Sequence, residues 1–427
     1  MKKILPLNRG LQGNITIPGD KSISHRSIML SSLGNTPVEI TNFLKGADCL
    51  STIACMRAMG VKIEEYNDKI LVTGNGLTGL AEPNNILDAG NSGTTLRLLL
   101  GLLSAQKFLT TFTGDDSLRR RPMGRVIKPL KMMGANIVGR NQNNNLPITI
   151  IPSAEKLRGI TYKMPVASAQ VKSAIILAGL YAEDVTTIIE PYPSRDHTEK
   201  MLSAFGAKIN KSHNEIKVYP TDNLIAPDKI EVPGDISSAA YWIVLATILK
   251  GSDVTIKNVG INETRTGIID VLRSMGAEID LVNERVSGGE LFADIHVVNS
   301  ELRGTTFGGE MIPRLIDEIP VIAVAAAFAE GDTIIKDVGE LRVKETDRLK
   351  AIVDEYNKIA AGAFEANADS LIIHGNRNFN FAECKTYDDH RMAMSLTIFG
   401  AAANGVSLDN DDCVKISYPD FYDKFYF

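Results

Sequence analysis

The chain repeats itself at intervals of about 72 residues, and this repeat limits its possible folds more than any other feature. In residues 59–63, 133–137, 205–209 and 275–279, a glycine separates a predicted helix end from a predicted strand, and successive glycines lie 74, 72 and 70 residues apart. Glycine suits a left-handed helix C-cap, and the alternating residues after it predict a strand. A less regular copy lies at 361–364. We therefore predict six α/β units, each with strands and two helices.

Helix starts recur at a similar interval. Pro-Gly-Asp occurs at 18–20 and again at 233–235, each time before an apolar helical run. Related helix starts, spaced 69 to 80 residues apart, are expected near Ser22, Asn91, Ser168, Ser237, Asp317 and Asp389. N-cap Ser, Asp and Asn are ordinary structural features, but cations such as Lys21, Arg26 and Arg391 are not, because a helix N-terminus repels them. Free N–H groups at helix starts favour an anion, so converging starts predict an anion-binding cleft.

Composition excludes several classes of protein. Lys and Arg number 46 and Asp and Glu number 51, which gives a net charge of −5 and argues against nucleic-acid binding. Hydrophobic residues make up 44% and charged residues 23%, as in ordinary globular chains. The longest apolar run, 319–329, contains Pro320 and is far shorter than the roughly 18 residues of a membrane span. We therefore expect no membrane contact.

Cysteine usage and the N-terminus predict a cytoplasmic protein. The four cysteines form no CxxC pair, which excludes a zinc ribbon and a disulfide scaffold and fits a reducing compartment. Asn8 and Arg9 stand where a secretory signal would have apolar residues. The acids and histidine at 388–390 are not part of an HExxH pattern, so we expect no metal site.

Single motifs in this chain have ordinary explanations as well as functional ones. Four arginines in 119–125 fit a solvated basic loop as well as a site for phosphate or carboxylate. The alternating charges of 342–348 fit an exposed, salt-bridged helix start. His197 fits a structural hydrogen-bonding role better than a catalytic one. Only the whole set of motifs, taken in order, separates these readings.

Eight segments together resemble the 5-enolpyruvylshikimate-3-phosphate synthase family. They are PGDKSISHR at 18–26, GNSGT at 90–94, RRPMGR at 120–125, ASAQVKSA at 167–174, SRDHTEK at 194–200, GDISSAA at 234–240, RVKETDRL at 342–349 and YDDHRMAM at 387–394. They follow the family's order and span nearly the whole chain. The ASAQ and RPMGR variants resemble the family's second class, which includes glyphosate-tolerant bacterial forms.

The resemblance implies a fold and a division into domains. The enolpyruvyl transferase fold is an α/β (α+β) fold of two domains, each of three βαβαββ units, whose helix N-termini face the cleft between them. The first strand is expected to belong with the C-terminal half, so that the chain crosses near residue 20 and again near residue 235. We therefore expect a discontinuous first domain of residues 1–19 plus 236–427, a second domain of residues 20–235, and an active site in the cleft.

The resemblance also implies a reaction. The enolpyruvyl group of phosphoenolpyruvate moves to the 5-hydroxyl of shikimate 3-phosphate, and phosphate is released. Shikimate 3-phosphate would be held by Lys21, Ser22, Arg26, Ser168, Gln170, Arg195, Asp317 and Lys344. Phosphoenolpyruvate would be held by Lys21, Gly93, Arg121, Gln170, Arg348, Arg391 and Lys415.

Three residues would carry the chemistry by the same resemblance. Asp317 would take the proton of the 5-hydroxyl, and Glu345 would exchange protons at C3 of phosphoenolpyruvate. Lys21 would neutralise phosphate and could shuttle a proton. The reaction needs no metal and no organic cofactor. The resemblance further implies glyphosate as an inhibitor, and we expect a monomer.

Two alternatives and two departures from the family pattern stay open at this point. The sister enolpyruvyl transferase, which acts on UDP-N-acetylglucosamine, typically uses a loop cysteine, and no cysteine lies between Cys55 and Cys384. A non-catalytic repeat protein that binds a phosphorylated partner would not need Asp317 and Glu345 beside its cations. Ala169 stands where many relatives have a second serine, and Leu98 where some have proline.

Overall fold

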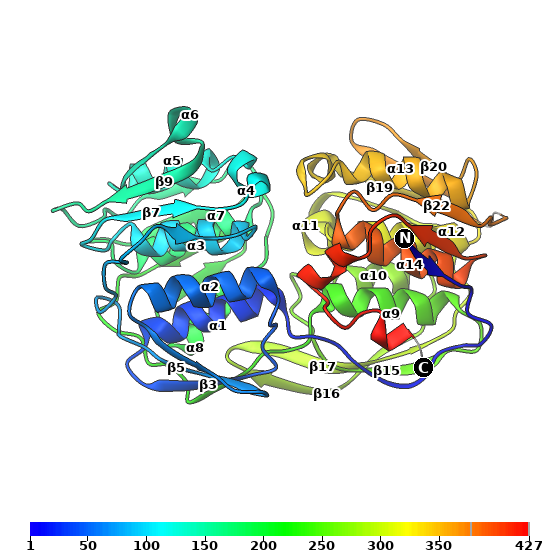
Figure 1. Ribbon diagram of the computed structural model, residues 1–427, viewed down its shortest axis with the longest axis horizontal. Helices are drawn as coiled ribbons and strands as arrows, with labels where there is room; N and C mark the ends of the chain where they lie inside the picture. The colour runs from blue at the N-terminus through cyan, green and yellow to red at the C-terminus, as the bar shows by residue number, and fades with distance from the viewer. Residues whose placement is uncertain (376–377, 426–427) are drawn as a thin grey trace. The chain divides into compact units, whose positions relative to one another are not determined.

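The computed structural model describes residues 1–375 and 378–425, in two compact units. Unit 1 consists of Met1–Pro18, Gly234–Arg285 and Leu291–Phe427, and unit 2 of Gly19–Pro233 with Val286–Glu290. The chain thus passes from one unit to the other inside each Pro-Gly-Asp segment. Figure 1 follows this path: the dark-blue N-terminal strand lies among the orange and red C-terminal elements of unit 1.

Unit 2 contains three four-stranded sheets among the described residues. Their strand orders are β14 (Lys229–Glu231)-β3 (Pro37–Thr41)-β5 (Lys69–Thr73)-β4 (Lys62–Glu65), β6 (Leu87–Asp88)-β7 (Thr110–Thr113)-β9 (Asn145–Ile151)-β8 (Asn136–Gly139), and β10 (Thr161–Lys163)-β11 (Thr186–Ile189)-β13 (Glu215–Val218)-β12 (Ile209–Ser212). The helices are α1 (Lys21–Leu33), α2 (Ala47–Ala58), α3 (Gly93–Leu103), α4 (Asp116–Arg120), α5 (Gly124–Met132), α6 (Arg140–Asn143), α7 (Ala169–Gly179) and α8 (His197–Ala204).

Unit 1 contains two four-stranded sheets and one three-stranded sheet in the same part of the chain. Their orders are β16 (Ile279–Ser287)-β17 (Glu290–Val298)-β15 (Asp253–Gly260)-β2 (Gln12–Thr16), β18 (Thr306–Phe307)-β19 (Asp332–Lys336)-β21 (Ser370–His374)-β20 (Phe364–Ala366), and β1 (Lys2–Ile4)-β23 (Val406–Leu408)-β22 (Ala382–Cys384). The α-helices are α9 (Ile236–Ile248), α10 (Gly267–Ser274), α11 (Ile312–Leu315), α12 (Ile319–Phe328), α13 (Arg348–Ile359) and α14 (His390–Ala402). Short 3₁₀ helices span Gly309–Met311, Gly339–Val343, Asp412–Ile416 and Asp423–Phe425.

The sheets repeat one pairing scheme, as the sequence repeat predicts. In the sheet of β6, the pair β6–β7 is parallel, whereas β7–β9 and β8–β9 are antiparallel. This is the register of a βαβαββ unit, with a helix in each crossover and a closing hairpin. The sixth unit is shorter than the other five, because the 3₁₀ helix Asp412–Ile416 follows β23 and the N-terminal strand β1 completes the sheet.

Strands from distant parts of the chain complete two further sheets. β2 pairs in parallel with β15, and β14 pairs in parallel with β3. Where these strands end, the Pro-Gly-Asp segments bond reciprocally: the Asp20 N–H donates to Pro233 O at 2.7 Å, and the Asp235 N–H donates to Pro18 O at 2.9 Å. Each hydrogen bond lies within one unit, because Asp20 and Pro233 belong to unit 2 and Asp235 and Pro18 to unit 1.

The glycines of the repeat adopt the predicted left-handed conformation. Gly60, Gly134, Gly206 and Gly276 have φ of 84°, 103°, 81° and 101°, and Gly362 of the irregular copy has φ of 68°. Residues with a Cβ rarely adopt such angles, so these positions favour glycine.

The predicted helix starts also agree with the structure, each within two residues. Asp20, Ser92, Asp235 and Asp389 act as N-caps whose side chains accept a main-chain N–H of the first turn. Ser168 and Glu318 occupy the N-cap positions of α7 and α12 without such a bond. The helices that begin here are buried, so the caps fix charged first turns against a rigid core.

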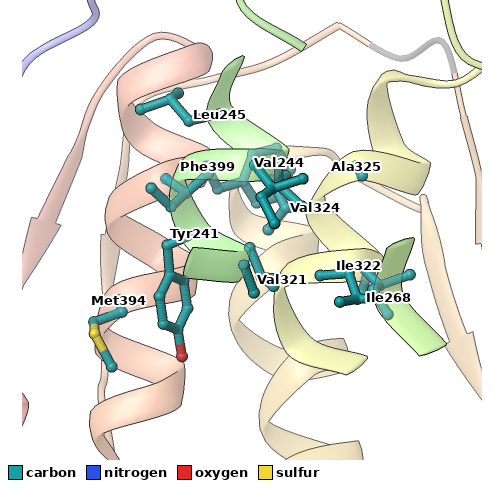
Figure 2. Packing of buried hydrophobic residues seen from close by; sticks show 14 of the residues in the cluster. Tyr241, Val244, Leu245, Ile268, Val321, Ile322, Val324, Ala325, Met394 and Phe399 are labelled. Carbon is teal, nitrogen blue, oxygen red and sulfur yellow. The ribbon is translucent and has the colours of Figure 1, made fainter. Parts of the chain in front are cut away.

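Helices α9, α12 and α14 pack against one another in the core of unit 1, as Figure 2 shows. Tyr241 and Val244 of α9, Val321 and Val324 of α12 and Phe399 of α14 lie in one buried cluster. Because α12 is apolar on every side, it is enclosed rather than half-exposed. The core therefore leaves the first turns of these helices as the place where polar side chains can gather.

In unit 2, helices α3 and α7 approach so closely that a Cβ at Gly101 would lie 2.1 Å from Ala174 O. Gly101→Ala should therefore lower the free energy of unfolding by roughly 1–3 kcal/mol, the cost of overpacking a core. In a solvent-exposed helix, Gly→Ala stabilises by about 0.5–1 kcal/mol. A decrease in the free energy of unfolding for Gly101→Ala therefore indicates the clash with Ala174. Urea unfolding measures it, and a stabilised variant would contradict the close approach of α3 and α7.

Candidate active site

In unit 2, the first turn of α1 presents Lys21 to a carboxylate. The Lys21 ammonium forms an ion pair with Asp48, in the first turn of α2, and the two side chains are 24% and 10% exposed. An acid at a helix start is favoured by the helix dipole. Lys21 is thus held charged and partly open to solvent, which suits a group that receives an anionic ligand.

One turn further along α1, Arg26 is buried and fixed by neutral acceptors. Its guanidinium donates to Thr198 Oγ1 at 2.7 Å, to Ser173 Oγ at 2.8 Å and to Ser22 O at 2.9 Å. Burial lowers the pKa of Arg26 to about 10, and the charge of Glu199 opposes this shift. The bonds join α1 to α7 and α8, so the structure brings the predicted residues Ser22 and Arg26 together on a rigid base.

The first turns of α3 and α7 meet at Gln170. The Gln170 amide donates to Thr94 Oγ1 at 3.0 Å, and its carbonyl oxygen accepts from the Arg97 guanidinium. Gly93 opens α3 beside these groups: a Cβ there would lie 3.0 Å from Arg97 Nη1 and 3.5 Å from Arg121 Nη1. Because Gly93 has no Cβ, both guanidinium groups can lie close to its main chain.

The arginines of residues 119–125 do not all lie in the same place. Arg121 ends α4 and donates to Asn91 Oδ1 at 2.8 Å, so it joins the group around Gly93. Arg119 and Arg120 instead line a separate hollow of about 450 Å³, together with Arg140 and others. The arginine that the sequence analysis assigned to phosphoenolpyruvate is Arg121, and this is the one that contacts Asn91 just before α3.

In unit 1, Arg348 lies at the centre of a buried network of charges. Its guanidinium donates to Asp389 Oδ2 at 2.7 Å, to Glu345 Oε2 at 2.6 Å and to Asp317 Oδ1 at 3.4 Å. Arg348 and Asp389 are 0% exposed. Burial disfavours the charge of Arg348, but Asp389 and Glu345 raise the pKa of its guanidinium above the ordinary value. A buried charge of this kind is stable only because it is paired.

Glu345 is a carboxyl group held in its ionised form. Partial burial works against that charge, yet Arg348 outweighs it, with help from His390 and Lys344, and holds the pKa of Glu345 well below its usual range. The side chain is 37% exposed, so it remains within reach of a ligand. A ligand anion that took over Arg348 would weaken this effect and raise the pKa of Glu345.

Asp317 lies among three cations just before α12. It is 3.5 Å from Lys344 Nζ, 3.4 Å from Arg348 Nη1 and 3.8 Å from Arg391 Nη2, and its side chain is 12% exposed. Arg391 of α14 also donates to Asp317 O at 3.3 Å. Asp317, Glu345, Lys344, Arg348 and Arg391, all predicted from the sequence, thus form one cluster.

Three predicted residues stand apart from these closest contacts. Ser168 is the half-buried N-cap of α7, and Arg195 lies half-buried in the turn before α8. Lys415 lies on the 3₁₀ helix Asp412–Ile416 with its side chain 70% exposed, and its ammonium pairs with Asp412 Oδ1 at 2.6 Å. Lys415 thus pairs with an exposed acid outside the cluster, whereas Arg348 and Arg391 both lie beside Asp317 within it.

Sequence reasoning assigned no site role to several partners of the predicted residues. Asp48 pairs with Lys21, Arg97 with Gln170, and Asp389 with Arg348. Glu318, buried beside Asp317, accepts from Ser237 Oγ and lies 3.7 Å from Arg391 Nη1. Of these partners, only Arg97 and Asp389 could have been identified from the sequence, because each lies within a motif at a predicted helix start.

Two further searches of the described residues bear on the kind of site. They contain no group of three or more His, Cys, Asp or Glu side chains placed to hold a metal ion. No helix in residues 1–375 or 378–425 is long and apolar enough to cross a membrane.

Comparisons with known proteins agree over nearly the whole chain. Residues 7–425 match the family model of EPSP synthase (3-phosphoshikimate 1-carboxyvinyltransferase). A 3-phosphoshikimate 1-carboxyvinyltransferase of Thermoanaerobacter sp. (strain X514) is 56% identical over 418 residues, which are 98% of this chain and 97% of that protein. The solved structure of EPSP synthase from Acinetobacter baumannii is 43% identical, with a TM-score of 0.89 over 99% of this chain and 96% of that one.

A more distant structure shares the fold alone. The enolpyruvyl transferase NikO from Streptomyces tendae is 18% identical, with a TM-score of 0.78 over 99% of this chain and 95% of that one. The family model and the relative at 56% identity decide the family itself. The chain belongs to the EPSP synthase (3-phosphoshikimate 1-carboxyvinyltransferase) family, transferases of the shikimate pathway.

Proposed function

We propose that this chain transfers the enolpyruvyl group of phosphoenolpyruvate to the 5-hydroxyl of shikimate 3-phosphate through Asp317, Glu345 and Lys21. The observation that carries the proposal is the pair Asp317 and Glu345, two carboxylates that share the buried cation Arg348. Binding alone would not need acids beside its cations. Acid and base groups next to anion-holding arginines are what an addition–elimination reaction between two phosphorylated carboxylates requires.

The proton steps follow from the surroundings of the two acids. Asp317 accepts the proton of the 5-hydroxyl while the hydroxyl oxygen attacks C2 of phosphoenolpyruvate and C3 gains a proton. The tetrahedral intermediate then loses phosphate as the bond between C2 and the phosphate oxygen breaks, and C3 gives up a proton to restore the double bond. Glu345 is our candidate for the C3 proton, because substrate carboxylate at Arg348 would raise its pKa.

Binding roles follow the two clusters. Phosphoenolpyruvate takes its carboxylate to Arg348 and Arg391, and its phosphate to the cations of unit 2. Its proposed partners are Lys21, Gly93, Arg121, Gln170, Arg348, Arg391 and Lys415. Shikimate 3-phosphate is proposed to bind Lys21, Ser22, Arg26, Ser168, Gln170, Arg195, Asp317 and Lys344. Lys415 would have to leave Asp412, an exposed pair that contributes little stability.

The sister reaction with UDP-N-acetylglucosamine is less well supported. That enzyme typically uses a loop cysteine, and the four cysteines of this chain are free and buried. Burial raises the pKa of the Cys55 thiol to about 12, so it is a poor acid near neutral pH. A phosphate-release assay with each acceptor distinguishes the two reactions.

We also propose the finer properties that the sequence suggests: membership of the second class, a cytoplasmic location, a monomeric state and inhibition by glyphosate. The ASAQ and RPMGR segments support the class, and the free cysteines support a reducing compartment.

Domain closure is the second prediction. The reaction needs Lys21 of unit 2 and Asp317 of unit 1 on one pair of substrates, so we propose that the active site forms in a cleft between two domains, residues 1–19 plus 236–427 and residues 20–235. Shikimate 3-phosphate should draw the domains together. Small-angle scattering should show a smaller radius of gyration with this ligand than with unphosphorylated shikimate; an unchanged radius would count against closure.

The third prediction concerns the acids. Asp317→Asn and Glu345→Gln should leave phosphoenolpyruvate binding largely intact and lower turnover by roughly 10²–10⁴-fold, as loss of a general acid or base does. Asp354→Asn is the matched control, because Asp354 pairs with Lys350 on the exposed face of α13. Steady-state kinetics measures all three, and turnover within a few-fold of the parent in both acid variants would refute the assignment.

The fourth prediction concerns glyphosate, which we propose competes with phosphoenolpyruvate beside Gly93. A methyl group there would meet Arg97 and Arg121 and narrow the space for the longer inhibitor more than for the substrate. Gly93→Ala should therefore raise the inhibition constant of glyphosate about tenfold more than the KM of phosphoenolpyruvate, a difference of about 1.4 kcal/mol. Equal changes in both constants would show that residue 93 does not distinguish them.

A further inference from the structure

A chain of four buried side chains connects α1 to the start of α3. His25 Nδ1 lies 2.6 Å from Thr52 Oγ1, Thr52 Oγ1 lies 2.7 Å from Thr95 Oγ1, and Thr95 Oγ1 lies 2.8 Å from Ser92 Oγ. All four residues are 0% exposed. The chain lies wholly within unit 2 and none of its members has a role in the reaction proposed above.

The histidine end of this chain is neutral. Burial lowers the pKa of His25 to about 3, and the pull of Asp48 in the opposite direction is weaker. His25 Nε2 is buried and has no hydrogen-bond partner among the described residues. A buried N–H without an acceptor is rarer and costlier than a buried lone pair without a donor. The proton therefore belongs on Nδ1, which donates to Thr52.

A fixed donor at one end gives the whole chain one direction. Because Thr52 accepts from His25, its own hydroxyl donates to Thr95, and the Thr95 hydroxyl is left to donate to Ser92 Oγ or to Asp48 O at 3.3 Å. Ser92 Oγ also accepts the Thr95 N–H at 3.1 Å, as the N-cap of α3. The N-cap hydroxyl of α3 is thus connected to α1 through a continuous series of hydrogen bonds.

The far end of the chain is the residue before Gly93. Ser92 is held by Thr95 on one side of the first turn, while Thr94 is held by Gln170 on the other. Gly93 therefore lies between two residues whose side chains are both hydrogen-bonded, which restrains its main chain beside Arg97 and Arg121. This place in α3 is where the proposed function puts phosphoenolpyruvate.

We propose that His25 is a positioning residue for phosphoenolpyruvate: as a neutral Nδ1–H donor it orients the chain Thr52–Thr95–Ser92 and so holds the first turn of α3 at Gly93. The inference rests on the proposed function for the identity of the ligand at Gly93. The repeat supports a role beyond folding, because the corresponding position in the segment that opens α9 is Ala240, which is equally buried.

The tautomer can be tested on the parent protein without any substitution. In ¹⁵N-histidine-labelled enzyme, His25 should give the nitrogen shifts of a neutral ring protonated at Nδ1, unchanged from pH 8 down to acid unfolding. A ring protonated at Nε2, or one that titrates in the native protein, would overturn the proposal, because the chain would then lack its fixed donor.

Kinetics tests the positioning role, since the proposed function assigns Gly93 of α3 to phosphoenolpyruvate alone, and Ser22 and Arg26 of α1 to shikimate 3-phosphate alone. His25→Leu and Thr52→Val should each raise the KM of phosphoenolpyruvate about tenfold, as expected for one lost buried hydrogen bond of about 1.4 kcal/mol. The KM of shikimate 3-phosphate should change less than about twofold. His25→Asn, whose amide nitrogen replaces Nδ1 as a donor, should stay within about threefold of the parent.

The double variant His25→Leu/Thr52→Val supplies the last measurement. If both residues act through one chain, its KM for phosphoenolpyruvate should equal that of either single variant. Multiplied effects, equal effects on both substrates, or failure of asparagine to outperform leucine would overturn the proposal in variants that melt like the parent. If the variants do not fold, the ¹⁵N measurement of the His25 tautomer in the parent protein decides the proposal. If the parent transfers no enolpyruvyl group, the proposed function fails, and that result is distinct from a failure of the His25 proposal.

Discussion

The helix starts of this enzyme gather charges that must be paired before any substrate arrives. Arg348 and Asp389 are fully buried, and neither would be stable there without the other. Asp389 is also the N-cap of α14, so one carboxylate fixes both a helix and a guanidinium. The remaining contacts of Arg348, to Asp317 and Glu345, are weaker in geometry or more exposed. In the proposed function, these are the pairs that a substrate anion replaces.

The same division appears in unit 2. Arg26 is buried and held by hydroxyl and carbonyl oxygens, whereas Lys21 meets a carboxylate at a partly open site. Arg26 is therefore fixed by several neutral partners, whereas Lys21 has a carboxylate partner that a ligand anion would replace in the proposed function. Phosphorylated carboxylates suit such a site because each ligand oxygen can take over a position that a side-chain carboxylate holds in the resting enzyme.

Close packing gives these charges their fixed positions. Helices α3 and α7 meet at Gly101 with no space for a Cβ, which brings Thr94 within 3.0 Å of Gln170. On the other side of α3, hydroxyl groups and a neutral histidine fill the space down to α1. A neutral chain can be buried at little cost when every hydroxyl has a partner, and it does not alter the charge that the substrates meet.

The sequence by itself determined the features that depend on near neighbours. The left-handed glycines, the six helix starts and the candidate cations follow from residues within one turn of each other, and the motifs in order determined the family. Tertiary structure decided which charges meet. Asp48 pairs with Lys21, Asp389 pairs with Arg348, and β1 completes a sheet some 400 residues away in sequence. Such partners are chosen by packing and by the need to neutralise buried charge, which no local pattern records.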